Sequence, residues 1–323
     1  MRPLSILYRG PLSSCNYGCE YCPFAKRKES RAELAEDRAA LGRFVAWCSD
    51  TEHRLSVLFT PWGEALTRRA YRDALATLSR LPHVRRVAAQ TNLSGPLDAM
   101  LAQAEPARLA LWCTYHPEWS TRARFLAQCA KLDAAGVRYS VGMVGFRRFL
   151  PEIRAMREAL RDDVYLWVNA VKREPYEEAD VREIEAIDPL FRINTVRHPS
   201  LGEACGAGED VISVDGSGDI RRCHFVRDVI GNLYSGELAL RPRPCSEREC
   251  GCHIGYVHMP RLGLSPIFGE GLLERVPDGW PFSPARMDEL RAHARRVTSS
   301  RRALVVLGDQ RVPQGGGPSP GAQ

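Results

Sequence analysis

The chain has 323 residues, of which 44% are hydrophobic and 26% charged, and its formal net charge is +6. This composition is ordinary for a globular protein with a sizeable core, and the length exceeds one average domain. Arginines are spread rather than clustered, and apolar runs are too short for a membrane span, so neither a nucleic acid nor a membrane is an expected partner. The N-terminus turns polar too soon for a signal peptide, and the eleven cysteines are an odd number. We therefore expect a cytoplasmic protein whose cysteines bind metal rather than form disulfides.

Apolar runs typical of buried strands alternate with helical segments through the first 188 residues. A capping box of Ser30 and Glu33 predicts the start of the first helix. Ser120 is expected to cap a later helix, which Gly136 ends. Six strand–helix units in succession predict parallel strands joined by right-handed crossovers. The strands are expected at residues 4–9, 55–60, 84–91, 108–115, 138–144 and 164–171.

Three cysteines follow the first strand in a C-x-x-x-C-x-x-C spacing, at Cys15, Cys19 and Cys22. The surrounding Pro, Ser, Asn and Gly residues are typical of a loop, and a curled loop can direct three thiolates toward one group. Three thiolates can hold a cubic iron–sulfur cluster by three of its four irons, which leaves one iron open. The alternative is a zinc site whose fourth ligand lies elsewhere in the chain.

This cysteine spacing, with Tyr21 before the last cysteine, resembles the signature of the radical S-adenosylmethionine (radical SAM) superfamily. The resemblance implies that Cys15, Cys19 and Cys22 ligate a [4Fe–4S] cluster whose open iron chelates S-adenosylmethionine. It implies reductive cleavage of S-adenosylmethionine to a 5′-deoxyadenosyl radical, with flavodoxin or ferredoxin as a possible electron donor. It also implies an α/β fold, a partial (β/α)6 TIM-like barrel, where the residue pattern alone predicts only a parallel sheet.

Further candidate residues follow the predicted strands, at the carboxyl ends where sites of such sheets lie. Residues 61–64, Pro-Trp-Gly-Glu, resemble in part the G-G-E-P turn of the family, with Trp62 in place of the first glycine and Ala65 in place of the proline. By resemblance, Glu64 binds the amino group of the methionine moiety and Gly63 lets the backbone approach it. The alternative is a plain strand-to-helix turn with Glu64 in the first helical turn.

Other polar residues at strand ends are weaker candidates. In the family, residues at these places often contact the ribose or the methionine carboxylate, but each can equally cap a helix or satisfy a loop. His116 fits a structural loop histidine better than a catalyst, and no catalytic residue is assigned. The cofactor-binding candidates are therefore Tyr21, Gly63, Glu64, Thr91, Asn92 and Asn169.

Five more cysteines lie in a short segment beyond residue 188, around a predicted hairpin of residues 211–215 and 219–223. This segment resembles the SPASM/Twitch extension of radical SAM enzymes, and the resemblance implies an auxiliary [4Fe–4S] cluster. Two of the ligands are expected to be Cys205 and Cys223, and which two among the last three complete the set stays open. The alternative is a zinc knuckle that uses His253 or His258. The candidate ligands are Cys205, Cys223, Cys245, Cys250 and Cys252.

The sequence thus predicts a radical SAM core at 1–188, a small cysteine-rich extension at 189–262, a C-terminal segment at 263–310 and a disordered tail at 311–323. The expected function is hydrogen abstraction from a peptide or protein side chain, which would make the protein a peptide-modifying oxidoreductase. One alternative is a small-molecule radical dehydrogenase of the Twitch type. The alternative from another class is a zinc-binding module without catalysis.

Overall fold

The computed structural model describes residues 3–22, 24 and 27–299. Its main sheet has ten strands in the order β11-β10-β9-β8-β1-β2-β3-β4-β5-β6. The strands β1 to β6 are all parallel, as the strand–helix alternation predicts. The fold class is therefore confirmed. These six strands are β1 (Leu4–Arg9), β2 (Leu55–Phe59), β3 (Val84–Thr91), β4 (Leu109–Thr114), β5 (Arg138–Val144) and β6 (Leu166–Asn169).

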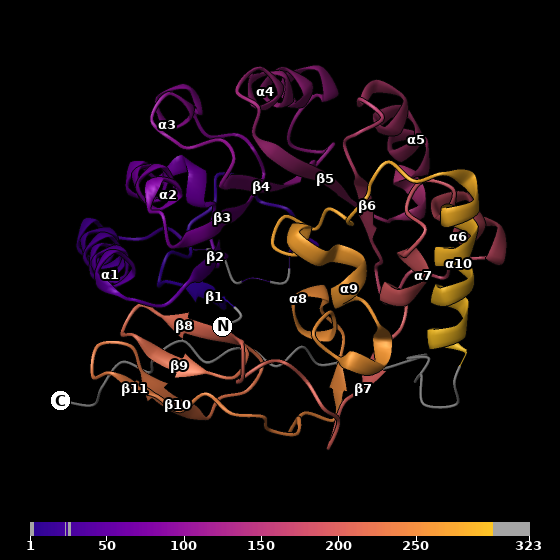
Figure 1. Cartoon of the computed structure of the whole chain (residues 1–323). Coiled ribbons are helices and arrows are strands. Elements are labelled where there is room, and N and C mark those ends of the chain that lie inside the picture. The colour runs from indigo at the N-terminus through magenta and orange to yellow at the C-terminus, as the bar shows by residue number, and fades with distance from the viewer. Residues whose placement is uncertain (1–2, 23, 25–26, 300–323) are drawn as a thin grey trace.

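Helices cover the outer face of the curved sheet, where Figure 1 shows α1 to α5 side by side. Ser30 and Glu33 form the predicted capping box of the first helix. The cap of α4 is Thr121 rather than Ser120, because the Thr121 hydroxyl accepts from the backbone N–H of Arg124. Gly136 follows that helix with a φ of +67°, as its role at the end of the helix requires. The outer helices are α1 (Arg31–Asp50), α2 (Arg69–Arg80), α3 (Asp98–Leu101), α4 (Arg122–Ala134), α5 (Leu150–Ala159) and α6 (Glu178–Glu185).

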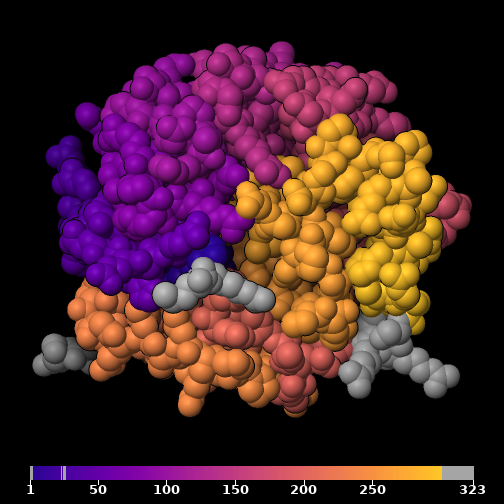
Figure 2. Space-filling model, viewed as in Figure 1, coloured from indigo at the N-terminus to yellow at the C-terminus, as the bar shows by residue number. Residues whose placement is uncertain are grey.

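The segment beyond residue 188 extends the sheet and fills its inner face. β8 pairs with β1 in parallel, and the predicted hairpin to β9 is present. Short helices of this segment lie inside the arc of strands (Figure 1), and their orange atoms meet the purple atoms of the N-terminal half in Figure 2. The elements of this segment are α7 (Phe191–Asn194), β7 (His198–Pro199), β8 (Val211–Asp215), β9 (Asp219–Arg221), β10 (Val229–Asn232), β11 (Glu237–Leu238), β12 (Glu249–Cys250), α8 (His253–Tyr256), α9 (Ser265–Phe268) and α10 (Pro284–Thr298), with 3-10 turns at Pro260–Leu262 and Gly269–Gly271. Two further 3-10 turns, at Ala65–Thr67 and Arg147–Phe149, lie in the first 188 residues.

The sheet divides the core into two layers, one on each face, because successive side chains of a strand point to opposite faces. In β1, Ile6 and Tyr8 pack toward the outer helices, whereas Leu7 packs with the inner cluster. That inner cluster joins Trp112 of β4 to Tyr256 and Phe268 of the C-terminal segment. An inner-facing residue at the carboxyl end of a strand therefore points into the mouth of the barrel.

The division at residue 188 stays a prediction, although β8 makes the extension continuous with the core sheet. The expected tail at 311–323 lies outside the described residues, as does the end of the 263–310 segment. Among the helices that the structure describes, none has the length and apolar character to cross a membrane.

Candidate functional site

The cysteine loop is fastened to the protein by Glu29. Its carboxylate accepts from the backbone N–H groups of Ser13 (2.6 Å) and Ser14 (3.2 Å) and from the Ser14 hydroxyl (2.5 Å). Arg68 also donates to that hydroxyl at 2.5 Å. Burial acts to raise the pKa of Glu29, but these hydrogen bonds outweigh it and lower the pKa on balance. The Glu29 carboxylate thus holds the start of the loop that carries the three cysteines.

The same loop pairs with the turn after β2. The N–H of Gly63 donates to Leu12 O and that of Glu64 to Ser14 O, both at 3.0 Å. A Cβ at Gly63 would overlap the Ser14 carbonyl, so only glycine lets the two backbones approach this closely. The close approach that the sequence suggests at Gly63 is therefore made toward the cysteine loop.

Glu64 is the centre of a hydrogen-bond network that joins the ends of β2 and β3. Its Oε1 accepts from Leu66 N (2.9 Å) and the Thr91 hydroxyl (2.7 Å), and its Oε2 accepts from Asn92 N (2.7 Å). The residue is only 4% exposed, and burial raises the pKa of its carboxyl, while the three donors act to lower it. A carboxylate has about four lone-pair sites. One therefore remains for a further donor, so the predicted contact with an ammonium group stays a prediction.

Asn92 links this network to the first cysteine. Its side-chain amide donates to the Cys15 sulfur (3.8 Å) and to Asn16 Oδ1 (3.0 Å), and the Tyr17 N–H also donates to Cys15 (3.4 Å). N–H donors directed at sulfur favour the thiolate, which is the form that binds iron. The donor set at Cys15 thus fits a cluster ligand.

Cys19 and Tyr21 meet at the end of β4. The Tyr21 hydroxyl lies 2.9 Å from His116 Nδ1, and the Cys19 sulfur lies 3.7 Å from the same nitrogen. Burial raises the pKa of Tyr21, and the adjacent Cys19 raises it further. Cys22 is half-buried and donates its N–H to Cys19 O at 3.2 Å, which tightens the turn between them. His116 therefore lies in the site beside the candidate ligand Cys19. The sequence alone favoured a structural loop role for this histidine.

Asn169 stands apart from this network. It ends β6 as an exposed residue, and its carbonyl accepts from Gly145 N at 2.8 Å. The nearby Gly142 leaves the space that the Trp167 ring occupies, because a Cβ there would overlap that ring. The structure brings together Cys15, Gly63, Glu64, Thr91 and Asn92, and it places Tyr21 with Cys19 and His116.

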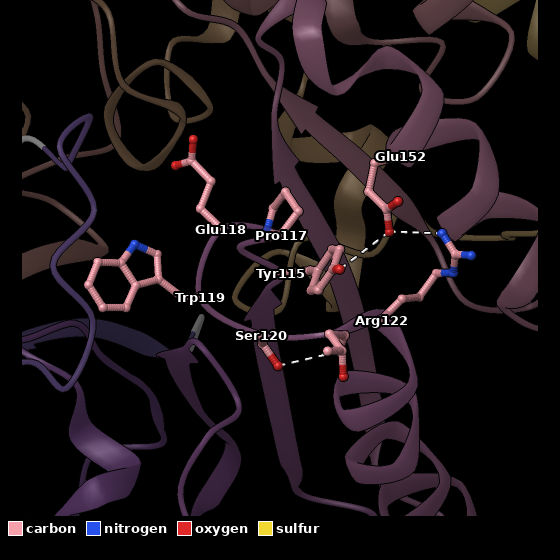
Figure 3. Close-up of a pocket in the computed structure, with 8 residues that line it drawn as sticks. Tyr115, Pro117, Glu118, Trp119, Ser120, Arg122 and Glu152 are labelled. Carbon is pink, nitrogen blue, oxygen red and sulfur yellow. Dashed lines mark hydrogen bonds and ion pairs between the residues drawn. The ribbon is translucent and has the colours of Figure 1, made fainter.

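An open cavity of about 500 Å³ lies beside the cysteine loop, formed by the loop after β4 and by Glu152 of α5. Figure 3 shows the Tyr115 hydroxyl and Arg122 directed at the Glu152 carboxylate, at 3.3 and 2.8 Å. Trp119 stacks on Tyr17 of the cysteine loop with ring centroids 5.7 Å apart. The cavity thus borders the candidate site, and the Glu152 carboxylate that lines it already accepts hydrogen bonds from Tyr115 and Arg122.

The cysteines of the extension form a second group. Burial raises the pKa of Cys223, and the neighbouring Cys245 and Cys205 raise it further. Burial likewise raises the pKa of Cys250, with contributions from Cys252, Cys223 and Cys205. Cys205 and Cys223 thus lie within electrostatic reach of each other and of both Cys245 and Cys250, and Cys252 has the largest charge effect on Cys250.

Cys252 also acts on the barrel mouth, and Cys250 shares its effect on Lys172. Burial lowers the pKa of Arg9, and the charge of Cys252 acts to raise it. Cys252 acts to raise the pKa of Lys172 as well. Arg9 ends β1, and Lys172 follows β6. Cys252 therefore lies between the extension and the strand ends of the core.

The alternative zinc sites find little support in the geometry. Within the described ranges, no group of three or more His, Cys, Asp or Glu side chains is placed to hold one metal ion. His253 packs against Trp112 and Phe268 in the inner core, and burial lowers its pKa well below the usual value. Burial also lowers the pKa of His258 to about 4. In a cubic cluster each thiolate binds a different iron, so convergence on one ion is not required.

Sequence reasoning missed the residues that support the site. Glu29 and Arg68 stand in helix-flanking positions with no strand before them, so nothing local marks them. Arg9 could have been found, because it is a charged residue that ends an otherwise apolar strand directly before the cysteine loop.

Comparison with solved structures agrees with this architecture. Two structures of anSMEcpe with bound AdoMet each align with a TM-score of 0.50, over 93% of this chain and 94% and 98% of theirs, at 11% and 12% sequence identity. BtrN in complex with AdoMet and 2-DOIA aligns over 73% of this chain and 80% of its own, with a TM-score of 0.37 and 15% identity. No family model and no curated protein matches the sequence. At these identities the anSMEcpe structures show a shared fold, and the BtrN likeness is too low to add to it.

Proposed function

We propose that this protein is a radical SAM enzyme, and one observation carries the proposal. The loop with the C-x-x-x-C-x-Tyr-C pattern lies at the carboxyl ends of six parallel strands, tied to the turn at Glu64 and to Asn92. The shared fold with AdoMet-bound anSMEcpe supports it. When bound, the cluster would supply the electron that cleaves S-adenosylmethionine to a 5′-deoxyadenosyl radical.

The residues present fit these groups at several points. Cys15, Cys19 and Cys22 would hold the cluster, and the N–H donors at Cys15 would stabilise its thiolate. Glu64 would accept from the ammonium group of S-adenosylmethionine at its remaining lone pair, close to Thr91 and Asn92. Asn169 and Gly63 would complete the strand ends around it.

For the extension, we propose an auxiliary [4Fe–4S] cluster on Cys205, Cys223 and two of the three cysteines Cys245, Cys250 and Cys252. The mutual electrostatic influence of these thiols supports the set. Arg222 also supports it, because this buried side chain lies beside Cys205, where a cation favours thiolate. The substrate that we propose first is a peptide or protein side chain, and an electron donor such as flavodoxin or ferredoxin would serve the reaction.

The test is 5′-deoxyadenosine formation by anaerobically reconstituted protein with dithionite. Changing Cys15, Cys19 and Cys22 together to Ala should abolish it, while iron in the extension remains. Cys129→Ala, which removes a buried thiol on the apolar face of α4, is the matched control and should leave it unchanged. Deoxyadenosine from the triple variant would refute the assignment, and zinc without sulfide in the wild-type protein would instead favour the binding module.

A further inference from the structure

Arg9 is a buried cation without a carboxylate partner. It is 8% exposed, and no Asp or Glu of the described residues lies within ion-pair distance of it. A guanidinium carries five N–H donors. The structure records one hydrogen bond, from Nη2 to the Thr60 hydroxyl at 3.4 Å, and leaves the buried Nε without a partner. Buried charges are normally paired, so an arginine in this state indicates a missing anion.

The position of Arg9 places that anion at the mouth of the barrel. Arg9 follows Tyr8, which faces the outer helices, so strand alternation directs Arg9 to the inner face. Thr60 and Gln90 stand at the same level on the next two strands, and the Thr60 hydroxyl donates to Gln90 Oε1 at 2.5 Å. The polar row thus runs across the carboxyl ends of β1, β2 and β3.

Two aromatic rings hold the guanidinium from the side of the cysteine loop. The Arg9 Cζ lies 4.3 Å from the Trp62 ring centroid and 5.5 Å from that of Phe24, and the two rings meet edge to face at 5.0 Å. Stacking leaves the edge of a guanidinium available for hydrogen bonds in its own plane. Phe24 follows Cys22 by two residues, so this aromatic pair joins Arg9 to the predicted cluster loop.

The extension supplies another polar group near Arg9. His224 follows Cys223, has Arg9 as its charged neighbour, and keeps a buried Nδ1 without a partner. Burial lowers the pKa of Arg9 to about 10, so the guanidinium stays charged near neutral pH. A positive charge with a flat donor edge and no carboxylate partner among the described residues matches a carboxylate, which carries one negative charge and accepts two parallel N–H bonds.

We propose that Arg9 anchors a carboxylate of the substrate in the barrel mouth, with the Trp62 and Phe24 rings fixing the guanidinium and His224 as a second polar contact. That the bound anion belongs to a substrate rests on the proposed function, whereas the anion site itself does not. The substrate class is therefore a molecule with a free carboxylate, either a small acid or an acidic side chain of a peptide.

The test measures binding of N-acetylglycine to the reconstituted full-length protein by ligand-observed NMR, without S-adenosylmethionine. We expect saturable binding to the wild type and none of the neutral N-acetylglycinamide. Arg9→Gln should weaken binding about tenfold or more, the usual effect of losing a charge-assisted hydrogen bond. Arg286→Gln is the matched control and should bind as the wild type does, because Arg286 also lies over an aromatic ring, Phe282, but on exposed α10 beside Glu289.

The other arms decide between sources and rival roles. A capped Gly-Glu-Gly peptide that binds more tightly than N-acetylglycine assigns the carboxylate to a peptide, and the reverse assigns it to a small acid. Arg9→Lys keeps the charge but loses the planar donor edge, so it should bind severalfold more weakly even where Arg9→Gln does not fold.

Three results would overturn the proposal: equal binding by the wild type and Arg9→Gln, binding of inorganic phosphate without N-acetylglycine, or loss of iron from the extension in Arg9→Gln. The last would mean that Arg9 balances the charge of the cysteines. Anion binding in a protein that makes no 5′-deoxyadenosine would leave this site standing and remove the proposed function. Deoxyadenosine formation without anion binding would do the opposite.

Discussion

Replacing Glu64 by Gln tests the network that joins the ends of β2 and β3. The amide keeps the shape of the carboxylate but replaces one oxygen with an N–H donor. In its better orientation the amide nitrogen takes the place of Oε2 and faces the Asn92 N–H, which Glu64 accepts at 2.7 Å. In the other orientation it faces both Leu66 N and the Thr91 hydroxyl. Either way a buried donor loses its acceptor.

The magnitude follows from these contacts. An unsatisfied buried donor costs about 1–3 kcal/mol, and the two remaining hydrogen bonds weaken because their acceptor is no longer charged. The neutral amide also escapes the cost of burying a charge, the same cost that raises the pKa of Glu64, and this offsets part of the loss. We therefore expect Glu64→Gln to lower the free energy of unfolding by about 2 kcal/mol.

Anaerobic guanidinium unfolding followed by circular dichroism measures this change, and equilibrium binding of S-adenosylmethionine measures the second effect. Loss of the charge-assisted contact should weaken that binding about tenfold to a hundredfold. Glu36→Gln, on the exposed side of α1, is the control and should change the stability by less than about 0.5 kcal/mol. A Glu64→Gln protein with wild-type stability would refute the network argument, and one with unchanged affinity would remove Glu64 from the binding site.

Three further changes test the loop and the extension. Glu29→Gln should loosen the cysteine loop and reduce iron incorporation. It should also remove the stabilisation that the Glu29 carboxylate gives the folded protein, which is present above the unfolded pKa of about 4.3 and is lost as pH falls through the lowered folded pKa. Unfolding at pH 7 and pH 3 measures this loss. Gly63→Ala should cost about 1–3 kcal/mol, because the new Cβ overlaps the Ser14 carbonyl; thermal unfolding measures it. Cys223→Ala should lower the iron content by one cluster and make residues beyond 188 protease-sensitive, because small metal domains depend on their metal for folding.

Two of these changes have a matched control variant elsewhere in the chain. Gly42→Ala lies in α1 with no atom within 4 Å of the new Cβ, so it should stabilise the protein by about 0.5–1 kcal/mol where Gly63→Ala destabilises it. Cys48→Ala, which removes a buried thiol of α1, should keep the iron that Cys223→Ala loses. Full iron in Cys223→Ala, or a Glu29→Gln protein with an unchanged pH dependence, would contradict the corresponding argument.

Local patterns were enough to predict the strands and where the polar residues stand on them. Buried parallel strands are continuous apolar runs, so β1 to β5 begin and end within one residue of the predicted limits, whereas β6 is shorter at both ends. Because Glu64 and Thr91 are at or next to strand ends, their convergence follows from the parallel topology alone.

The remaining features depend on contacts between distant segments. The pairing of β8 with β1 joins residues about two hundred positions apart, and no local pattern encodes that choice of partner. Glu29 is recognisable only once the cysteine loop has folded back, since its donors are backbone N–H groups that any residue could supply. The gathering of the extension cysteines likewise depends on how β12 and α8 are placed.

Trp62 connects the partial match of the sequence to the chemistry of the barrel mouth. In the turn that residues 61–64 resemble, a glycine stands at this position, and the replacement weakens the likeness. In the structure, the backbone hydrogen bonds between the turn and the cysteine loop come from the next two residues, because the N–H groups of Gly63 and Glu64 donate to that loop. The side chain at position 62 is thus not constrained by that pairing, and its ring lies over Arg9 at 4.3 Å. A turn that keeps Gly63 and Glu64 for the loop and the network can therefore carry an aromatic residue over a buried arginine, and this residue helps to set what the barrel mouth accepts under the anion-site proposal.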